Sequence, residues 1–248
     1  MYATGLTDVG LARSQNQDAI FVSTGQIGPL PNLFIVADGM GGHNAGEVAS
    51  KQAVECISEY IQAYPLAELM HSDNFLDLMV NATQYASSYV HQLSVENEEM
   101  RGMGTTLTAC VLTDEKVIIA HIGDSRAYAI SKEKITQLTT DHTYIAELVQ
   151  AGEVTAEDAR THPKRHVLTR VLGVPGHCEV DGYATELSGI STLLLCSDGL
   201  SNMLDDAALM EIVNGGGFAK TRVQLLIEEA NKKGGLDNIS AILIDVGR

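Results

Sequence analysis

The sequence predicts an α+β fold in which antiparallel β-sheets carry helices on their outer faces. Strand-like segments follow one another through short turns, helical segments come in adjacent pairs, and the chain ends on another strand-like segment. Regular alternation of strand and helix would instead predict a parallel sheet, whereas neighbouring strands with short loops favour antiparallel pairing. Apolar residues make up 45% of the 248 residues, enough for a large core. We therefore expect a single domain over residues 1–248.

The first half of the chain is expected to form strands and then a pair of helices. The strands are expected over residues 2–8, 19–22 and 33–37. The last of these is fully apolar, so it is predicted to be buried on both faces. From Gly46 apolar residues recur at helical spacing until Pro65 ends the helix, and a second amphipathic helix covers about residues 74–93.

The second half returns to strands and closes with helices and a final strand. Strands are expected over residues 105–112, 117–122, 126–131, 193–196 and 239–246. Helices are expected over residues 143–151, after the N-cap Thr155, and over residues 206–213 and 222–233. Residues 141–178 form the most polar and histidine-bearing part of the chain, and we expect them to form a small mobile lobe on the β scaffold.

The net charge of the chain argues against two classes of binding partner. Sixteen basic residues stand against 32 acidic ones, a net charge of −16. Nucleic acids and anionic membrane surfaces need a basic footprint, so neither is expected as a partner. No signal segment or membrane-spanning run is apparent, and the cysteines lack metal-type spacing, which favours a reducing cytoplasmic location.

Aspartates recur at the ends of the predicted apolar strands. Asp38, Asp124, Asp198 and Asp237 each lie beside or close to a glycine at such an end, and Asp18 precedes another strand. Any one of them could simply form a turn. Together they predict a site for hard divalent cations, Mg²⁺ or Mn²⁺, with oxygen ligands. Two ions about 3.5–4 Å apart would activate water and clamp a phosphate ester.

Other phosphate chemistry is less compatible with the sequence. The glycines at 39, 41 and 42 lack the Lys-Ser/Thr pair of a P-loop, and a Gly-x-Ser-x-Gly nucleophile elbow is missing. No nucleophilic side chain is indicated, so no phosphoenzyme is expected. Arg13 offers a planar fork for a phosphate, although a surface ion pair explains it equally well.

These motifs resemble a known family. The matching residues are Arg13-x-x-Asn16-Gln17-Asp18, Asp38-Gly39-Met40-Gly41-Gly42-His43, Gly102-Met103-Gly104-Thr105-Thr106, Gly123-Asp124-Ser125-Arg126, Asp141-His142-Thr143, Ser197-Asp198-Gly199-Leu200 and Gly235-Leu236-Asp237-Asn238-Ile239. In this order they resemble the metal-dependent protein serine/threonine phosphatases of type 2C, in particular the short bacterial single-domain members. The resemblance covers nearly the whole chain.

The resemblance implies a four-layer αββα sandwich with a metal cluster in a cleft at one edge of the sheets. Asp38 would bridge two Mn²⁺ or Mg²⁺ ions, the carbonyl of Gly39 would bind one of them, and Asp198 and Asp237 would complete the other. Asp18 would hold metal-bound waters.

Further roles also follow from the resemblance. Asp124, with Asp198, would form a weaker third metal site, and Arg13 would bind the substrate phosphate. The lobe over residues 141–178 would correspond to the family's flap, which is thought to influence substrate choice.

The sequence leaves two interpretations of the group that protonates the leaving oxygen. Animal members carry a histidine directly after the Asp-Gly pair, where this chain has Met40. We expect His43 to be the general acid for the leaving oxygen. The alternative is that His43 only packs the turn while a metal-bound water supplies the proton.

The expected function is hydrolysis of phosphoserine and phosphothreonine in proteins by a metal-bridging hydroxide. The partners would be phosphoproteins and the cytoplasmic serine/threonine kinase that the enzyme opposes, and the chain is expected to be a monomer. A non-catalytic, metal-dependent regulatory module on the same scaffold is the alternative. A third interpretation keeps the catalysis but takes small phosphate esters as substrates.

Overall fold

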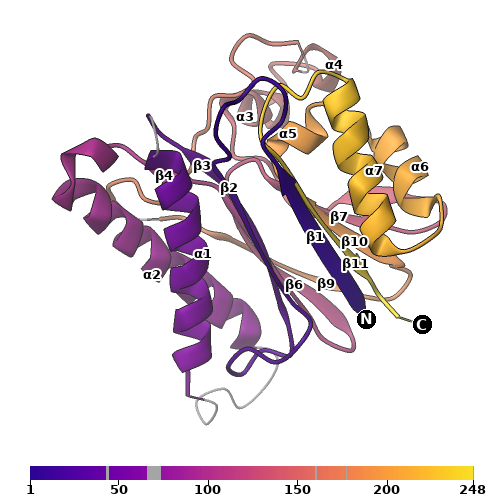
Figure 1. The fold of residues 1–248 in the computed structure, drawn as a ribbon, viewed down its shortest axis with the longest axis horizontal. Coiled ribbons are helices and arrows are strands. Elements are labelled where there is room, and N and C mark those ends of the chain that lie inside the picture. The colour runs from indigo at the N-terminus through magenta and orange to yellow at the C-terminus, as the bar shows by residue number, and fades with distance from the viewer. Residues whose placement is uncertain (43–44, 66–73, 160, 177, 248) are drawn as a thin grey trace.

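The fold consists of two β-sheets packed face to face between two layers of helices (Figure 1). It is seen in a computed structural model that describes residues 1–42, 45–65, 74–159, 161–176 and 178–247. In Figure 1 helices α1 and α2 lie on one side, α6 and α7 on the other, and a lobe with α3 and α4 stands above the sheet ends. Both predicted features, antiparallel sheets and flanking helices, are confirmed.

Both sheets are antiparallel throughout. The first has the spatial order β1 (Tyr2–Asp8), β11 (Ile239–Asp245), β10 (Thr192–Cys196), β7 (Arg126–Ile130) and β8 (Ile135–Gln137). The second has the order β2 (Asp18–Ser23), β3 (Leu33–Met40), β5 (Leu107–Leu112), β6 (Lys116–Ile122) and β9 (Asp181–Glu186), with the short β4 (Gly104–Thr105) paired to the end of β3.

The helices divide between the two outer faces and the lobe. The longer ones are α1 (Ala45–Ala63), α2 (Phe75–Glu96), α6 (Asp206–Asn214) and α7 (Ala219–Lys232). The shorter ones are the 3₁₀ turn η3 (Glu98–Met100), α3 (Tyr144–Gln150), α4 (Ala156–Ala159) and α5 (Asp198–Ser201). The predicted N-cap is confirmed, because Thr155 accepts a hydrogen bond from the amide of Asp158. Thr143 caps α3 in the same way by accepting from the amide of Ala146.

Three hydrophobic clusters account for the layered arrangement. One lies between α1, α2 and the second sheet and includes Ile57 and Leu78. Another lies between α6, α7 and the first sheet. The third, with Phe34 and Ile242, lies between the two sheets. Because each sheet is apolar on both faces, strands such as β5 and β10 are buried along their whole length.

Several elements differ from the prediction. β3 continues through Asp38 to Met40, so this aspartate belongs to the strand and does not follow it. α7 begins at Ala219 rather than at residue 222, and β9 was not predicted. β9 is an edge strand whose side chains are alternately exposed and half-buried, so it lacks the apolar run that identifies the inner strands.

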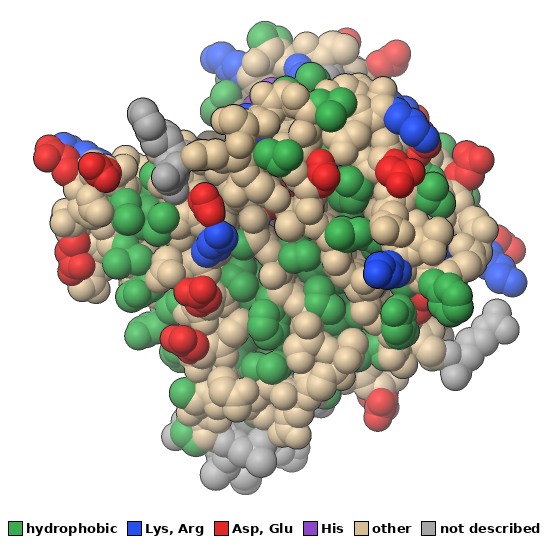
Figure 2. All heavy atoms as spheres, viewed as in Figure 1, with side chains coloured by type: hydrophobic (Ala, Val, Ile, Leu, Met, Phe, Trp, Pro, Cys, Tyr) green, Lys and Arg blue, Asp and Glu red, His purple; other side chains and the backbone are tan. Residues whose placement is uncertain are grey.

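One face of the molecule shows how its basic side chains are distributed. Over the face seen in Figure 2, Lys and Arg side chains stand apart from one another and form no continuous stripe. None of the helices in the described ranges combines the length and the apolar character that a membrane span requires.

Candidate metal centre

The β2–β3 pair sets two carboxyl groups against each other. In this antiparallel pair Asp18 lies directly opposite Asp38. Side chains at such positions are close neighbours on the same face of the sheet, and like charges there repel. Asp18 is only 4% exposed. Asp38 is half-buried. Two carboxyl groups crowded together with so little contact with solvent need either protons or a cation between them.

Three further aspartates reach the same edge from other strands. Asp198 begins α5 directly after β10, Asp237 precedes β11, and Asp124 lies in the turn between β6 and β7. The charges of Asp18, Asp198, Asp124 and Asp237 all act on the carboxyl group of Asp38. The structure therefore brings together all five aspartates selected from the sequence.

Burial and mutual repulsion shift the ionisation of these groups. Burial raises the pKa of Asp18 from its ordinary 3.8 to about 7, although hydroxyl donors from Ser240 and Ser197 oppose the rise. Burial and then the charge of Asp18 hold the pKa of Asp38 well above its usual range. Burial, and next the charge of Asp198, raise the pKa of Asp124 to about 8. The protein alone therefore does not compensate the negative charge that it gathers here.

Two buried carboxylate oxygens lack the partner that would balance the negative charge of the site. Oδ1 of Asp18 and Oδ1 of Asp198 are buried and have no hydrogen-bond partner. Buried polar atoms are nearly always satisfied, so such orphans point to a ligand. The donors are all oxygen, which fits a hard divalent cation such as Mg²⁺ or Mn²⁺. Within the described ranges no three His, Cys, Asp or Glu side chains are arranged to hold an ion by themselves. Backbone carbonyls and water would therefore have to complete its coordination.

Backbone packing brings Gly39 into the same region. A Cβ at this position would lie 2.0 Å from the carbonyl oxygen of Gly46 and 2.6 Å from that of Gln17. Only glycine lets β3 pass between the start of α1 and the segment before β2. The expected role of its carbonyl as a metal ligand is thus compatible with its position beside Asp38.

Arg13 forms an ion pair with one of the candidate ligands. Its Nη2 lies 2.8 Å from Oδ2 of Asp237, and its side chain is 52% exposed. This is the ion-pair alternative left open by the sequence, but with a partner inside the candidate site. A half-exposed guanidinium beside the acids remains available for a phosphate, so its proposed role stays a prediction.

Serine hydroxyls, to which the sequence assigned no role, hold Asp18. Its Oδ2 accepts hydrogen bonds from Ser197 at 2.7 Å and from Ser240 at 2.6 Å, which leaves Oδ1 free of protein donors. Both serines are fully buried. Asn238, next to Asp237, fixes the segment before β2 by accepting from the amide of Gln17 and donating to the carbonyls of Val9 and Gln15.

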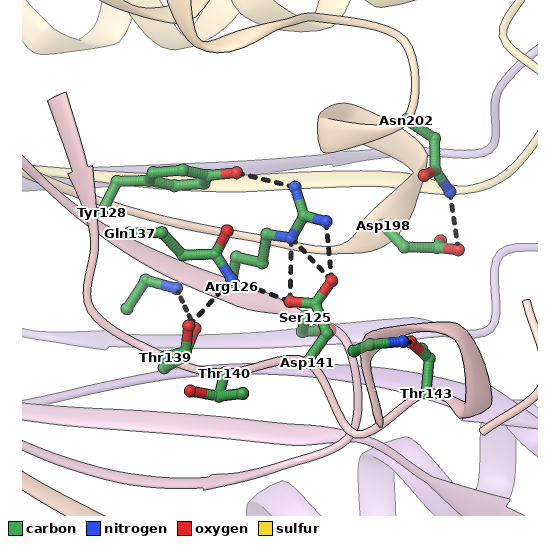
Figure 3. A network of polar contacts seen from close by, with 12 residues as sticks. Ser125, Arg126, Tyr128, Gln137, Thr139, Thr140, Asp141, Thr143, Asp198 and Asn202 are labelled. Atoms are coloured by element: carbon green, nitrogen blue, oxygen red, sulfur yellow. Dashed lines mark hydrogen bonds and ion pairs between the residues drawn. The ribbon is translucent and has the colours of Figure 1, made fainter. Parts of the chain in front are cut away.

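An arginine–aspartate pair beside the acids was likewise not identified from the sequence (Figure 3). Arg126 donates to Asp141 through Nε at 2.9 Å and through Nη2 at 2.6 Å, and its Nη1 donates to the hydroxyl of Tyr128. Gln137 donates to the same carboxylate. The pair joins β7 to the first residue of the 141–178 lobe.

We expect Arg126→Met to lower the free energy of unfolding by about 3 kcal/mol, because it leaves the carboxylate of Asp141 partly buried without its cation. Urea unfolding of the parent and the variant measures this change. Lys51→Met is a matched control, since Lys51 forms an exposed ion pair with Glu47 on α1. A loss below about 1 kcal/mol for Arg126→Met would contradict the assignment.

His43, the predicted general acid, lies outside the described residues. Asp124, expected at a third metal site with Asp198, does lie near that residue, because the charge of Asp198 contributes to its raised pKa.

Comparison with known proteins shows the family to which the chain belongs. The model of the protein phosphatase 2C family matches residues 12–233. A serine/threonine phosphatase, stp, from Listeria innocua is 36% identical over 247 residues, which cover 99% of this chain and 96% of that protein. The crystal structure of Stp1 from Staphylococcus aureus has a TM-score of 0.92 at 32% identity, over 99% of this chain and 95% of that one.

A further solved structure carries metal. It is the catalytic domain of the serine/threonine protein phosphatase PstP in complex with two manganese ions, with a TM-score of 0.83 at 30% identity, over 100% of this chain and 98% of that one. The fold and these similarities define a protein phosphatase, a hydrolase of phosphoric monoesters. The chain belongs to the protein phosphatase 2C family.

Proposed function

We propose that this chain removes phosphate from phosphoserine and phosphothreonine in proteins with the help of two divalent ions. The observation that carries the proposal is the gathering of five aspartates at one sheet edge, with buried, unpartnered oxygens on Asp18 and Asp198. The named activities of the relatives and the manganese of the PstP structure support it.

Each residue of the site has a definite task in this proposal. Asp38 would contact both ions, the Gly39 carbonyl one of them, and Asp198 and Asp237 the other. When bound, the ions supply a water of lowered pKa and positive charge beside the phosphate. Asp18, held by its serines, would accept hydrogen bonds from water at the cluster. Asp124 and Asp198 would form a third, weaker site.

Arg13 would bind the phosphate. A guanidinium offers two parallel donors to phosphate oxygens and stays charged at any working pH. Its half-exposed side chain can turn from Asp237 toward a ligand without breaking a buried contact. In this way it would orient the ester and neutralise charge that develops on its oxygens.

Chelation tests the proposal. Release of phosphate from a phosphothreonine peptide is expected with Mn²⁺ or Mg²⁺ and is expected to fall at least a hundredfold in EDTA, because no side chain replaces the metal-activated water. Full activity in EDTA would contradict the metal mechanism. Peptide binding with no phosphate release under any metal condition would favour the regulatory module. Faster hydrolysis of p-nitrophenyl phosphate than of every phosphopeptide would favour small esters.

His43 is proposed as the general acid. If it protonates the leaving oxygen, His43→Ala should slow the hydrolysis of an alkyl phosphate about a hundredfold and that of p-nitrophenyl phosphate much less, since a good leaving group needs no proton. The ratio of the two kcat values measures this. An equal loss on both esters would argue against the role.

The proposal also includes the domain extent, the cellular location, the oligomeric state and the opposing kinase. We take residues 1–248 as one catalytic domain, acting in the cytoplasm as a monomer against a serine/threonine kinase, with the lobe over residues 141–178 beside the cleft. Sedimentation of the purified chain at a mass other than 26.5 kDa would overturn the monomer.

A further inference from the structure

One buried histidine binds both polar groups of a single backbone residue beside the candidate metal centre. The amide of His142 donates to the carbonyl of Gly123 at 2.7 Å, and its Nδ1 accepts from the amide of Gly123 at 3.1 Å. His142 is only 5% exposed. Gly123 directly precedes Asp124, so His142 fixes the backbone from which that carboxyl group projects.

The backbone conformation of Gly123 requires a glycine. Its φ of +108° is one that residues with a side chain rarely adopt, and a Cβ there would lie 2.5 Å from the side chain of Thr106. Glycine adopts such a φ without strain, and the two hydrogen bonds to His142 help to fix it in this conformation.

The other ring nitrogen of His142 reaches a different part of the molecule. Because Nδ1 is an acceptor, the proton of the neutral ring lies on Nε2, which donates to Oδ2 of Asp181 at 3.2 Å. Asp181, in β9, also accepts from Nη1 of Arg170 at 2.9 Å and from the hydroxyl of Tyr183 at 3.0 Å. The histidine therefore has two arms, one to the Asp124 turn and one to Asp181.

The bond to Asp181 joins two points of the lobe. His142 and Arg170 flank residues 143–169 of the lobe, and both donate to Asp181. Near the same point the amide of Thr169 donates to the carbonyl of His142 at 2.9 Å, and Thr143 pairs with Leu168. Residues 143–169 thus leave and rejoin the scaffold at one polar junction.

We infer that His142 is a positioning residue with two separable tasks. Its Nδ1 arm fixes Asp124 for the metal centre, and its Nε2 arm, through Asp181 and Arg170, fixes the lobe against the same centre. The inference rests on the proposed function for the identity of the site, but it concerns residues outside the metal ligands. According to this inference, one side chain, His142, holds both the lobe and the turn that carries Asp124.

Two amide substitutions separate the arms. In His142→Asn the amide oxygen can take the position of Nδ1, so the bond to Gly123 is retained and that to Asp181 is lost. In His142→Gln the amide nitrogen can take the position of Nε2, so the bond to Asp181 is retained and that to Gly123 is lost. Asp181→Asn is a third variant that touches only the lobe arm.

The readouts include one that does not depend on turnover. Calorimetric titration with Mn²⁺ should show at least tenfold weaker binding at the weakest site for His142→Gln, and a change of less than threefold for His142→Asn and Asp181→Asn. KM for a phosphopeptide should rise about fivefold or more in the latter two, while KM for p-nitrophenyl phosphate stays within twofold.

His121 supplies the matched control. It is fully buried, its ring lies 4.9 Å from that of His142, and it faces Asp181 across the β6–β9 pair. Its ring nitrogens, however, bond to Thr108 and Thr140 and not to Gly123 or Asp181. His121→Gln should lower the melting temperature without the changes in Mn²⁺ binding or in KM.

The outcomes are distinguishable. If His142→Asn and His142→Gln change both readouts alike, or if all variants lose only stability as His121→Gln does, the two-arm inference is wrong. If His142→Gln fails to fold, an unchanged peptide KM in Asp181→Asn overturns the inference. A parent that binds Mn²⁺ but releases no phosphate would contradict the proposed function instead, and the Mn²⁺ titrations would still test the Nδ1 arm.

Discussion

Asp38→Asn is expected to lower kcat/KM for a phosphothreonine peptide by at least a thousandfold, about 4 kcal/mol of transition-state stabilisation. Asp38 is the residue on which the charges of the other four aspartates act, so it is the natural bridge between two cations. Asparagine keeps the shape and the pairing of β3 but offers a neutral amide, which cannot hold two hard ions. Steady-state kinetics at several Mn²⁺ concentrations measures the loss.

The loss should not be a loss of folding. In metal-free buffer Asp38→Asn is expected to be at least as stable as the parent, because it removes one of several crowded, repelling charges. Asp114→Asn makes the same chemical change at an exposed position in the β5–β6 turn and should keep full activity. Retention of more than a tenth of the parent activity by Asp38→Asn would contradict the proposal that Asp38 holds the two metal ions.

The aspartates could be found from the sequence because each leaves a local signal. Asp38 and Asp198 each precede a glycine after an apolar run, and this pattern is visible without knowledge of the fold. Local sequence patterns do not predict that Asp18 lies opposite Asp38. This arrangement depends on the register of β2 against β3, which the intervening loop sets and the sequence does not state.

The supporting residues left no such signal. Ser197 and Ser240 are small polar residues beside strands, and only their convergence on one oxygen of Asp18 gives them a role. His142 was seen as part of a polar, histidine-bearing region, but its partners Gly123 and Asp181 come from separate strands and turns. Contacts between residues far apart in the chain follow from topology, so local patterns predict the carboxyl groups better than what holds them.

Asp18→Asn is expected to stabilise the metal-free protein, by an amount that increases with pH. Burial raises the pKa of Asp18 from 3.8 to about 7 in the folded state. Below pH 4 the group is protonated in both states and the substitution changes little. Between pH 4 and pH 7 the unfolded chain ionises first, so the parent progressively loses folding free energy, on the order of 4 kcal/mol by pH 7. Asparagine does not titrate, and the difference between the two proteins should level off above pH 7.

The geometry favours this substitution, and taking the difference between the two proteins removes the titration of groups that do not interact with Asp18. The amide oxygen of asparagine can accept from both Ser197 and Ser240, while its NH₂ replaces the unpartnered Oδ1 and can donate toward neighbouring carboxyl groups. Burial lowers the pKa of His121 to about 4, which makes the folded state less stable in acid, but this effect is common to both proteins and cancels in their difference. Urea unfolding in EDTA at several pH values from 4.5 to 8 gives that difference. Saturating Mn²⁺ should reverse its sign, because the cation compensates the parent's carboxylate and has less to bind in the variant. A difference in unfolding free energy that stays constant across the pH range would show that the pKa of Asp18 is not raised in the folded protein.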